Sequence, residues 1–230
     1  MRPKYAYYIR EVKMDIKNPL YKNQGIHVIT ALFTVEDGKF KVLLIKRNNE
    51  PFKDMWILVG GACYNNETVE EAMKREMFEK TGLKNINTTF FRVYSNPNRS
   101  PLMRMLAVVY IGVIDCKKVS IQKKTTKTKD ADWFLLDRVP PLGYDHSEIL
   151  KDATEFLKEK MFDSQLMKGL FPKTFTLPEL YKAYQSILDK GLDRRNFRKL
   201  LLSSGIIEPT GQLEATSGKK PAKLYKFCEK

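Results

Sequence analysis

One segment, residues 60–83, constrains the fold of this chain more than any other. It reads GGACYNNETVEEAMKREMFEKTGL, two glycines followed by a stretch rich in carboxylates and then by a further glycine. Thr68 and Glu71 have the spacing of a capping box, and Gly82 suits the left-handed position that ends a helix. The segment therefore predicts a helix over Val69–Thr81 with charged residues on one face.

The rest of the first 162 residues predicts a mixed α/β domain around this helix. The pair Asp37-Gly38 is typical of a hairpin turn. Gly60 and Gly61 are expected to form a loop after a strand, where the backbone can approach a ligand closely. A second helix is expected over Ser147–Met161. Aliphatic runs predict strands at His27–Phe33, Lys41–Ile45, Trp56–Val59, Met103–Ile114 and Ala131–Leu136.

Residues 61–83 resemble the Nudix box, whose pattern is G-x5-E-x7-R-E-U-x-E-E-x-G-U with U an aliphatic residue. The resemblance implies an α/β fold, an α-β-α sandwich with a mixed sheet, and carboxylates that hold a divalent metal for diphosphate hydrolysis. One position departs from the pattern, because Lys80 stands where the family has the last glutamate of the box. The matching positions are Gly61, Glu67, Arg75, Glu76, Met77, Glu79, Gly82 and Leu83.

Lys80 argues against catalysis, because hard cations need carboxylate oxygens and an ammonium reverses the local charge. No catalytic residue is therefore assigned, and Glu76, Glu79 and Lys80 are interpreted as vestigial. No metal is expected, with Glu76 and Glu79 as its ligands if one binds; no cofactor is required, although Mg²⁺ could bind at low affinity. The ammonium could bind a diphosphate directly or could pair with Glu76. Either arrangement favours a sensor that binds its ligand without turnover.

Four further stretches, LIKRNNEPFKDMW, YSNPNRSPLMR, DWFLLD and LGYDHSEIL, resemble the Nudix branch associated with ADP-ribose and NAD metabolism. By that likeness arginines would meet phosphate and aromatic rings would stack on a base, although Phe52 and Tyr94 could equally be core residues. Asp145 and Glu148 have the spacing of a capping box, and His146 between them has no metal-ligand partner and is left out of the catalytic residues. The candidate ligand-binding residues are Arg47, Phe52, Gly60, Gly61, Glu76, Lys80, Tyr94, Arg99 and Arg104.

A second domain is expected over residues 163–230, where short helical stretches precede a ribbon punctuated by Gly and Pro. Thr176 and Glu179 form another capping box, which opens a helix over Leu177–Asp189. Two short strands are expected at Ile206–Glu208 and Leu224–Phe227.

Between these elements the sequence predicts a helix with one strongly basic face. Asp193 is expected to cap it, Leu192 and Phe197 to pack across its start, and Gly205 to end it. Like charges four residues apart repel, so a polyanion would stabilise this face. The inward residues are expected to be Phe197, Leu200, Leu201 and Ser204, and the outward ones Arg194, Arg195, Arg198 and Lys199.

Residues 171–227 resemble the winged helix of Nudix-related transcriptional regulators, whose best-known branch represses genes of NAD metabolism. A sugar-responsive branch exists too. The resemblance implies a C-terminal winged helix-turn-helix domain in which the basic helix and the wing contact DNA. The candidate DNA-binding residues are Arg194, Arg195, Asn196, Arg198, Lys199, Lys219, Lys220 and Lys223.

Composition agrees with a nucleic-acid partner, because the formal net charge is +14 and favours polyanions. The three cysteines are scattered, which fits reduced thiols in the cytoplasm, and no apolar run approaches the roughly 20 residues of a membrane span. An RNA-binding module is the weakest interpretation, because the basic helix lacks the interleaved aromatic platforms on which bases stack.

We therefore predict a cytoplasmic, ligand-responsive transcriptional regulator, a repressor that acts on double-stranded operator DNA and not at a membrane. Helix-turn-helix proteins generally bind palindromes as dimers, so a homodimer is expected. The Nudix domain would sense ADP-ribose or a related nucleotide diphosphate and control NAD metabolism. The alternatives are an active pyrophosphatase for ADP-ribose-like substrates and a sugar-responsive regulator of the same family.

Overall fold

The computed structural model describes residues 23–162, 164–188, 193–214 and 221–228 of the 230-residue chain. A six-stranded sheet with the strand order β4-β5-β1-β3-β2-β6 forms the centre of the N-terminal part. β1 pairs parallel with β5, whereas the other pairings of this sheet are antiparallel, so the sheet is mixed as predicted. The strands are β1 (Gly25–Glu36), β2 (Lys39–Arg47), β3 (Trp56–Ala62), β4 (Thr88–Tyr94), β5 (Met105–Val113) and β6 (Thr128–Leu135).

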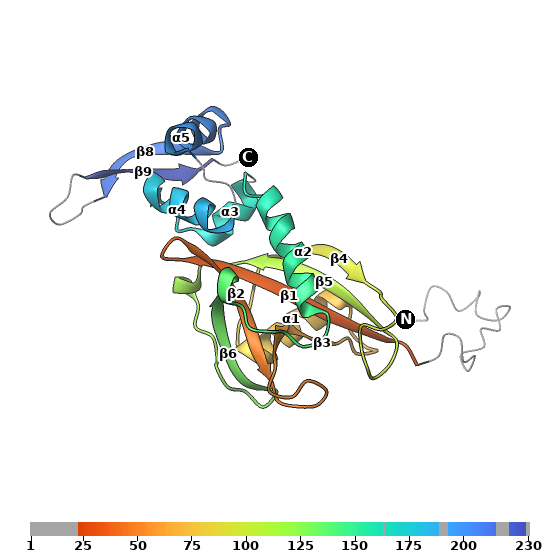
Figure 1. The fold of residues 1–230 in the computed structure, drawn as a ribbon. Coiled ribbons are helices and arrows are strands. Elements are labelled where there is room, and N and C mark those ends of the chain that lie inside the picture. The colour runs from red at the N-terminus through yellow and green to blue at the C-terminus, as the bar shows by residue number, and fades with distance from the viewer. Residues whose placement is uncertain (1–22, 163, 189–192, 215–220, 229–230) are drawn as a thin grey trace, which may run out of the picture.

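Helices cover both faces of this sheet. α1 (Val69–Thr81) lies behind it and α2 (His146–Glu159) in front of it in the view of Figure 1. Successive side chains of a strand point to opposite faces. Accordingly, Ile29 and Phe33 of β1 pack in one core cluster with α2, whereas Leu32 packs in another with α1. The predicted α-β-α sandwich is confirmed.

The limits of α1 are set by the residues that the sequence indicates. The Thr68 hydroxyl accepts a hydrogen bond from the Glu71 N–H at 3.2 Å, and the Glu71 carboxylate accepts one from the Thr68 N–H at 2.8 Å. At the other end Gly82 has a φ of 75°, which a residue with a side chain rarely adopts. The helix over Val69–Thr81 is therefore confirmed at both ends.

The C-terminal part folds as a winged helix, as predicted, and its small sheet has the strand order β7-β9-β8. The helix predicted over Leu177–Asp189 begins at the expected capping box of Thr176 and Glu179 and ends at Ile187. Asp189 lies outside the described residues. The elements are α3 (Ser164–Leu170), β7 (Phe175–Thr176), α4 (Leu177–Ile187), α5 (Arg194–Ser203), β8 (Ile207–Glu214) and β9 (Ala222–Phe227). Two single-turn 3₁₀ helices, η2 (Cys116–Lys118) and η3 (Leu136–Arg138), occur in the N-terminal part.

The buried stripe of α5 is narrower than predicted. Phe197 and Leu201 are buried, but Leu200 is 47% exposed and Ser204 is exposed as well. A helix of three turns on the surface of a small domain buries one i, i+4 row against its neighbours, which here are α4 and β8. The inward placement of Leu200 and Ser204 was therefore wrong, and the expected partner Leu192 lies outside the described residues.

The winged helix packs on the N-terminal part through one continuous hydrophobic core. The Phe40 N–H of β2 donates a hydrogen bond to the Ser186 hydroxyl of α4 at 3.1 Å, and the Tyr184 hydroxyl donates one to the Met161 carbonyl. The boundary expected between residues 162 and 163 falls in the link between α2 and α3. In the part of the chain that the structure describes, no helix is both long and apolar enough to cross a membrane.

Candidate functional site

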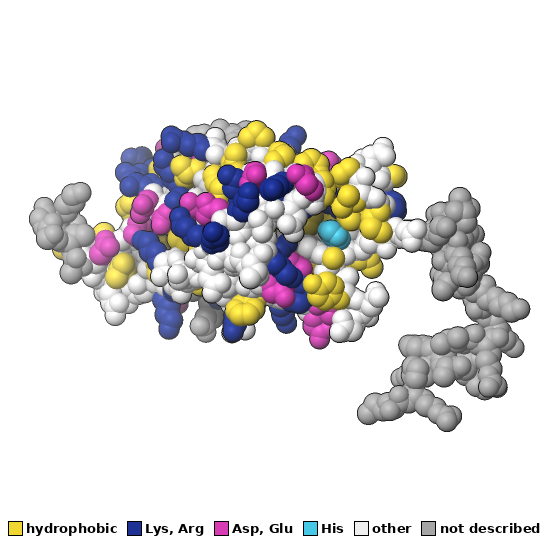
Figure 2. Space-filling model, turned by 90° about the horizontal axis from the view of Figure 1, so that it is seen from below, with side chains coloured by type: hydrophobic (Ala, Val, Ile, Leu, Met, Phe, Trp, Pro, Cys, Tyr) yellow, Lys and Arg dark blue, Asp and Glu magenta, His cyan; other side chains and the backbone are white. Residues whose placement is uncertain are grey.

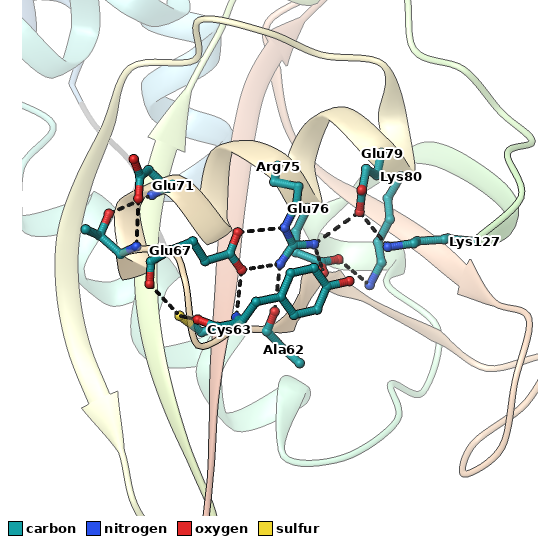
Figure 3. Close-up of polar contacts among 11 residues, drawn as sticks. Ala62, Cys63, Glu67, Glu71, Arg75, Glu76, Glu79, Lys80 and Lys127 are labelled. Carbon is teal, nitrogen blue, oxygen red and sulfur yellow. Dashed lines mark hydrogen bonds and ion pairs between the residues drawn. The ribbon is translucent and has the colours of Figure 1, made fainter.

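Arg75, a half-buried residue of α1, holds the acidic residues of the box together (Figure 3). Its guanidinium donates to Glu67 at 2.6 and 2.8 Å, to Glu76 at 2.6 Å and to Glu79 at 3.1 Å. It also donates to the Ala62 carbonyl at 2.8 Å. The hydrogen bonds from Arg75 lower the pKa of Glu67 to about 2, so this carboxylate stays charged at neutral pH. Arg75 thus forms ion pairs with the glutamates at all three matching positions of the box, Glu67, Glu76 and Glu79.

The two glycines before α1 are strand residues, which corrects the loop predicted there. Gly60 and Gly61 belong to β3 and pair with Ile29 and Val28 of β1. A Cβ on Gly61 would lie 2.3 Å from the Glu76 carboxyl carbon, closer than real contacts allow. Gly61 is thus required by the close approach of the box helix to the sheet, because the strand must leave room for the Glu76 side chain. A Cβ on Gly60 would instead lie 2.2 Å from the Val28 carbonyl oxygen of β1, so this glycine is required by the pairing of β3 with β1.

Substituting Gly61 by alanine is therefore expected to destabilise the protein. Overpacking a dense site costs roughly 1–3 kcal/mol, because Glu76 must leave its position beside the strand. Thermal unfolding followed by circular dichroism measures the loss. Gly25→Ala is the matched control, since it lies on β1 and its new Cβ would have no neighbour closer than 3.6 Å. Equal effects of the two substitutions would contradict the close approach of Glu76.

Lys80 lies deep in the site. Its ammonium is 3.1 Å from Glu76 Oε2 and also donates a hydrogen bond to the Gly60 carbonyl, and its side chain is only 12% exposed. Burial lowers the pKa of Lys80, and the adjacent Glu76 carboxylate opposes that fall. Of the two roles that the sequence left open, pairing with Glu76 is therefore present in the structure.

Lys127 completes the polar cluster, and the sequence did not indicate it. It lies directly before β6, and its ammonium donates to Glu79 Oε2 at 2.6 Å. Glu79 thereby bridges Lys127 and Arg75. No local pattern signals this contact, because its partners lie 48 positions apart in the chain.

Three adjoining cavities form a cleft beside this cluster. The first, of about 230 Å³, contains Arg47, Glu76, Lys80 and Lys127 in its wall, and a second of about 60 Å³ shares Arg47 and Lys80 with it. The third, of about 380 Å³, is joined to the second through Arg99 and Tyr144. Of the candidate ligand-binding residues, those that line the cleft are Arg47, Phe52, Gly60, Gly61, Glu76, Lys80, Tyr94 and Arg99.

Arg104 is the one candidate that lines none of these three cavities. Its guanidinium donates instead to the carbonyl of Ser95. A hydrogen bond to a backbone carbonyl suits a residue that fixes a loop.

Arg99 explains why the predicted capping box of α2 is wrong. Its guanidinium donates to both carboxylate oxygens of Asp145, at 2.8 and 2.7 Å, and Asp145 makes no side-chain hydrogen bond to the helix. A bidentate, charge-assisted pair is stronger than a cap to a backbone N–H. The carboxylate therefore orients Arg99 at the cleft instead of capping α2.

His146 has a structural role, in keeping with its omission from the catalytic residues. Its Nδ1 accepts a hydrogen bond from the Leu58 N–H of β3 at 3.0 Å. Burial lowers its pKa to about 3, so the ring is neutral at ordinary pH. Tyr144, which the sequence did not single out, stacks on this ring and lies beneath the Arg47 guanidinium at 5.2 Å. His146 thus ties α2 to the sheet and positions the aromatic wall of the cleft.

The outer face of α5 presents its cations to solvent. Arg194, Arg195, Arg198 and Lys199 are exposed together with Asn196, and within the described residues these cations form no ion pair. The only acidic residue beside them on this helix is the cap Asp193, whose carboxylate accepts from the Asn196 N–H at 2.7 Å. The underside of the molecule, in contrast, shows Lys and Arg interspersed with Asp and Glu (Figure 2).

The remaining DNA-binding candidates belong to the wing. Lys223 is exposed on β9 and shares a cavity wall with Arg194 and Arg198. Lys219 and Lys220 lie outside the described residues. Three of the described candidates, Arg194 and Arg198 of α5 and Lys223 of β9, therefore border one surface.

Comparisons with known proteins agree with both parts. Residues 25–153 match the family model of the NUDIX domain, and residues 168–227 match that of the NrtR DNA-binding winged helix domain. A repressor from Acinetobacter baylyi, described as ADPR responsive transcriptional repressor NtrR, is 30% identical over 97% of this chain and 88% of its own length. The ADP-ribose pyrophosphatase of Methanocaldococcus jannaschii is 38% identical over 55% of this chain and 73% of its own length.

Solved structures extend the match to the whole architecture. NrtR of Shewanella oneidensis, crystallised with a 27mer DNA, superposes with a TM-score of 0.71 at 27% identity, over 88% of this chain and 93% of that chain. The separate NUDIX domain of that protein, crystallised with ADP ribose, gives a TM-score of 0.57 at 27% identity, over 65% of this chain and 96% of that chain. The chain therefore belongs to the Nudix family and, within it, to the NrtR type of transcriptional regulators, in which a Nudix domain precedes a DNA-binding winged helix.

Proposed function

We propose that this chain is a repressor that binds operator DNA through α5 and the wing and responds to ADP-ribose in the Nudix cleft. The observation that carries the proposal is the pair of cationic surfaces, an arginine-lined cleft and an exposed basic helix free of acidic partners within the described residues. Arginine suits phosphate because its planar fork donates two hydrogen bonds at once. A protein that acts on operator DNA works in the cytoplasm, where that DNA is.

The cleft supports a nucleotide diphosphate rather than a neutral sugar. Arg47, Arg99 and Lys80 bring three cations to neighbouring walls of the second cavity. Phe52 and Tyr144, whose ring centroids are 4.6 Å apart, add an aromatic surface at the mouth of the third. Cations for phosphate and rings for a base are the combination that ADP-ribose requires. A neutral sugar offers no negative charge to these cations.

The proposal includes no hydrolysis. Glu67, Glu76 and Glu79 are all bound to Arg75, and Glu76 and Glu79 each face a lysine as well. Catalysis of diphosphate hydrolysis by a metal needs carboxylates that are free to hold it. Such a cluster favours binding without turnover. The alternative of an active pyrophosphatase rests on the likeness of the Nudix part to the Methanocaldococcus enzyme.

β2 offers a physical connection between the two surfaces. Arg47 at its end lines the cleft, while Phe40 near its start is hydrogen-bonded to Ser186 of α4. A ligand that moves β2 would therefore shift the winged helix, and in a homodimer on a palindrome it would change the spacing of the two recognition helices. Ligand control requires different affinities for the two arrangements.

A DNA mobility-shift assay on the promoter beside the gene for this protein tests the proposal. Adding ADP-ribose is expected to change the operator affinity at least about 5-fold, the lower limit of ordinary allosteric coupling, whereas NAD and glucose leave it unchanged. Unchanged affinity in ADP-ribose would exclude this effector, and a response to glucose alone would favour the sugar-responsive alternative. Cleavage of ADP-ribose in Mg²⁺ at enzymatic rates, followed by chromatography, would contradict the absence of hydrolysis.

A further inference from the structure

The divalent cation that a Nudix box implies does not fit this site. Lys80 places its ammonium against Glu76 Oε2 at 3.1 Å and against the Gly60 carbonyl, two oxygens of the kind that a hard cation binds. Glu67 forms an ion pair with Arg75, and Glu79 forms ion pairs with both Arg75 and Lys127. Among the described residues no group of three or more His, Cys, Asp or Glu side chains could hold a metal.

The charge of Lys80 explains the effect of a lysine where the family has a glutamate. An ammonium carries one positive charge, and so, in sum, does a glutamate together with a divalent cation. Lys80 therefore gives the cleft the formal charge that a Nudix site with glutamate here reaches only after it binds metal. The charged residues in the wall of the first cavity are Arg47, Lys80 and Lys127 against Glu76. This balance is positive without any metal and suits a diphosphate.

Geometry supports the same role. The Lys80 side chain is buried and anchored at two points, so its ammonium is fixed within the wall shared by the first two cavities. An ammonium has three N–H donors, and the Gly60 carbonyl accepts from one of them, so donors remain for a ligand. Arg47 lines the same two cavities and can meet the same anion.

We propose that the Lys80 ammonium is a built-in replacement for the divalent cation, so that this cleft binds the diphosphate of its ligand without metal. The inference rests on the proposed function in taking a nucleotide diphosphate as the ligand. It goes beyond that function in assigning the recognition of the diphosphate to Lys80 and in making recognition independent of metal supply. A regulator built in this way would report ligand concentration whatever the level of free Mg²⁺.

Calorimetry with ADP-ribose and with inorganic pyrophosphate, each in EDTA and in Mg²⁺, tests the proposal on the full chain. Wild-type protein is expected to bind with the same Kd in both conditions, within about 2-fold, since no metal takes part. Lys80→Glu is expected to lose at least about 100-fold in EDTA and to recover in Mg²⁺, because the variant again needs a cation. A wild-type affinity that collapses in EDTA would overturn the proposal, as would Lys80→Glu binding normally there.

A second measurement is independent of the organic ligand. Titration with Mn²⁺, followed by electron paramagnetic resonance, is expected to show a tight site in Lys80→Glu and none in wild type. Lys74→Glu is the matched control, because it makes the same charge change on an exposed position of α1 and should create no such site. A tight Mn²⁺ site in the wild-type cleft, removed by Glu76→Gln, would overturn the proposal.

Lys80→Gln keeps the test decisive if the Lys80→Glu variant does not fold. Glutamine removes the charge without placing a second carboxylate beside Glu76, and it is expected to weaken pyrophosphate binding at least about 10-fold in EDTA and in Mg²⁺ alike. Full affinity in this variant would refute the role of Lys80. If wild type binds pyrophosphate without metal but does not bind ADP-ribose, the proposed effector fails while the inference about Lys80 stands.

Discussion

Replacing Arg195 and Arg198 together by alanine is expected to weaken operator binding by roughly 30-fold or more. Each arginine that contacts DNA contributes about 1–3 kcal/mol, and both side chains are exposed on the outer face of α5. If both contact phosphates, the slope of log K against log salt should become shallower by about 2, because each lost phosphate contact releases roughly 0.9 fewer counterions. Fluorescence anisotropy with labelled operator at several salt concentrations measures both quantities.

The control removes the same charge from a different surface. Lys74 and Lys124 are exposed in the Nudix part, on α1 and in the loop before β6, and their double alanine variant lowers the net charge equally. It is expected to change operator affinity less than about 3-fold, the effect of net charge at physiological salt. Similar losses in both variants would mean that general charge, and not the face of α5, determines binding.

Replacing Arg75 by alanine is expected to be the most destabilising single change in the Nudix part. It leaves Glu67, Glu76 and Glu79 without the cation that joins them, and Glu76 is buried. Removing one partner of a buried ion pair costs roughly 3–5 kcal/mol, and the 20% exposure of the Arg75 side chain places the expected loss near the lower limit. Urea unfolding followed by circular dichroism measures it.

Acid should reduce the difference between Arg75→Ala and wild type. The bonds from Arg75 hold the pKa of Glu67 at about 2, below its usual value of 4.5, so the stability they contribute is present above pH 4.5 and disappears as the pH falls towards 2. Unfolding curves at pH 7 and pH 3 should therefore differ less between variant and wild type at pH 3. Arg75→Lys is the control, because it restores the charge without the planar fork and should recover only part of the loss. A pH-independent difference would argue against this account of Glu67.

Local sequence predicted the elements of the fold well where short-range contacts set their limits. The capping boxes at Thr68 and Thr176 bond residues three positions apart, and both are present in the structure. The aliphatic run of β1 likewise indicated a strand, and the structure has one there. The motif of residues 61–83 carried the resemblance to the Nudix box because its positions lie close together and each has a fixed chemical role.

Predictions from local spacing were wrong where a side chain or strand contacts residues that are distant in the sequence. Asp145 has the spacing of a cap, yet its carboxylate is bound by Arg99, which lies 46 positions away. Gly60 and Gly61 suit a loop, but they continue β3 because they pair with Ile29 and Val28 of β1. Lys127, which the sequence did not indicate, binds Glu79 from a position 48 residues away. Sequence spacing does not show which distant groups meet.

The sequence by itself determined the class of protein, the two domains and the departure at Lys80, because residue identity and short spacing are sufficient for each. Only the tertiary structure decided what Lys80 does. Its ammonium meets Glu76 one turn away on α1, but it also meets the Gly60 carbonyl on a strand, and that contact depends on how the helix packs on the sheet. The enclosure that makes the position resemble a cation site arises from this packing, since burial strengthens the electrostatic attraction between the ammonium and the oxygens around it.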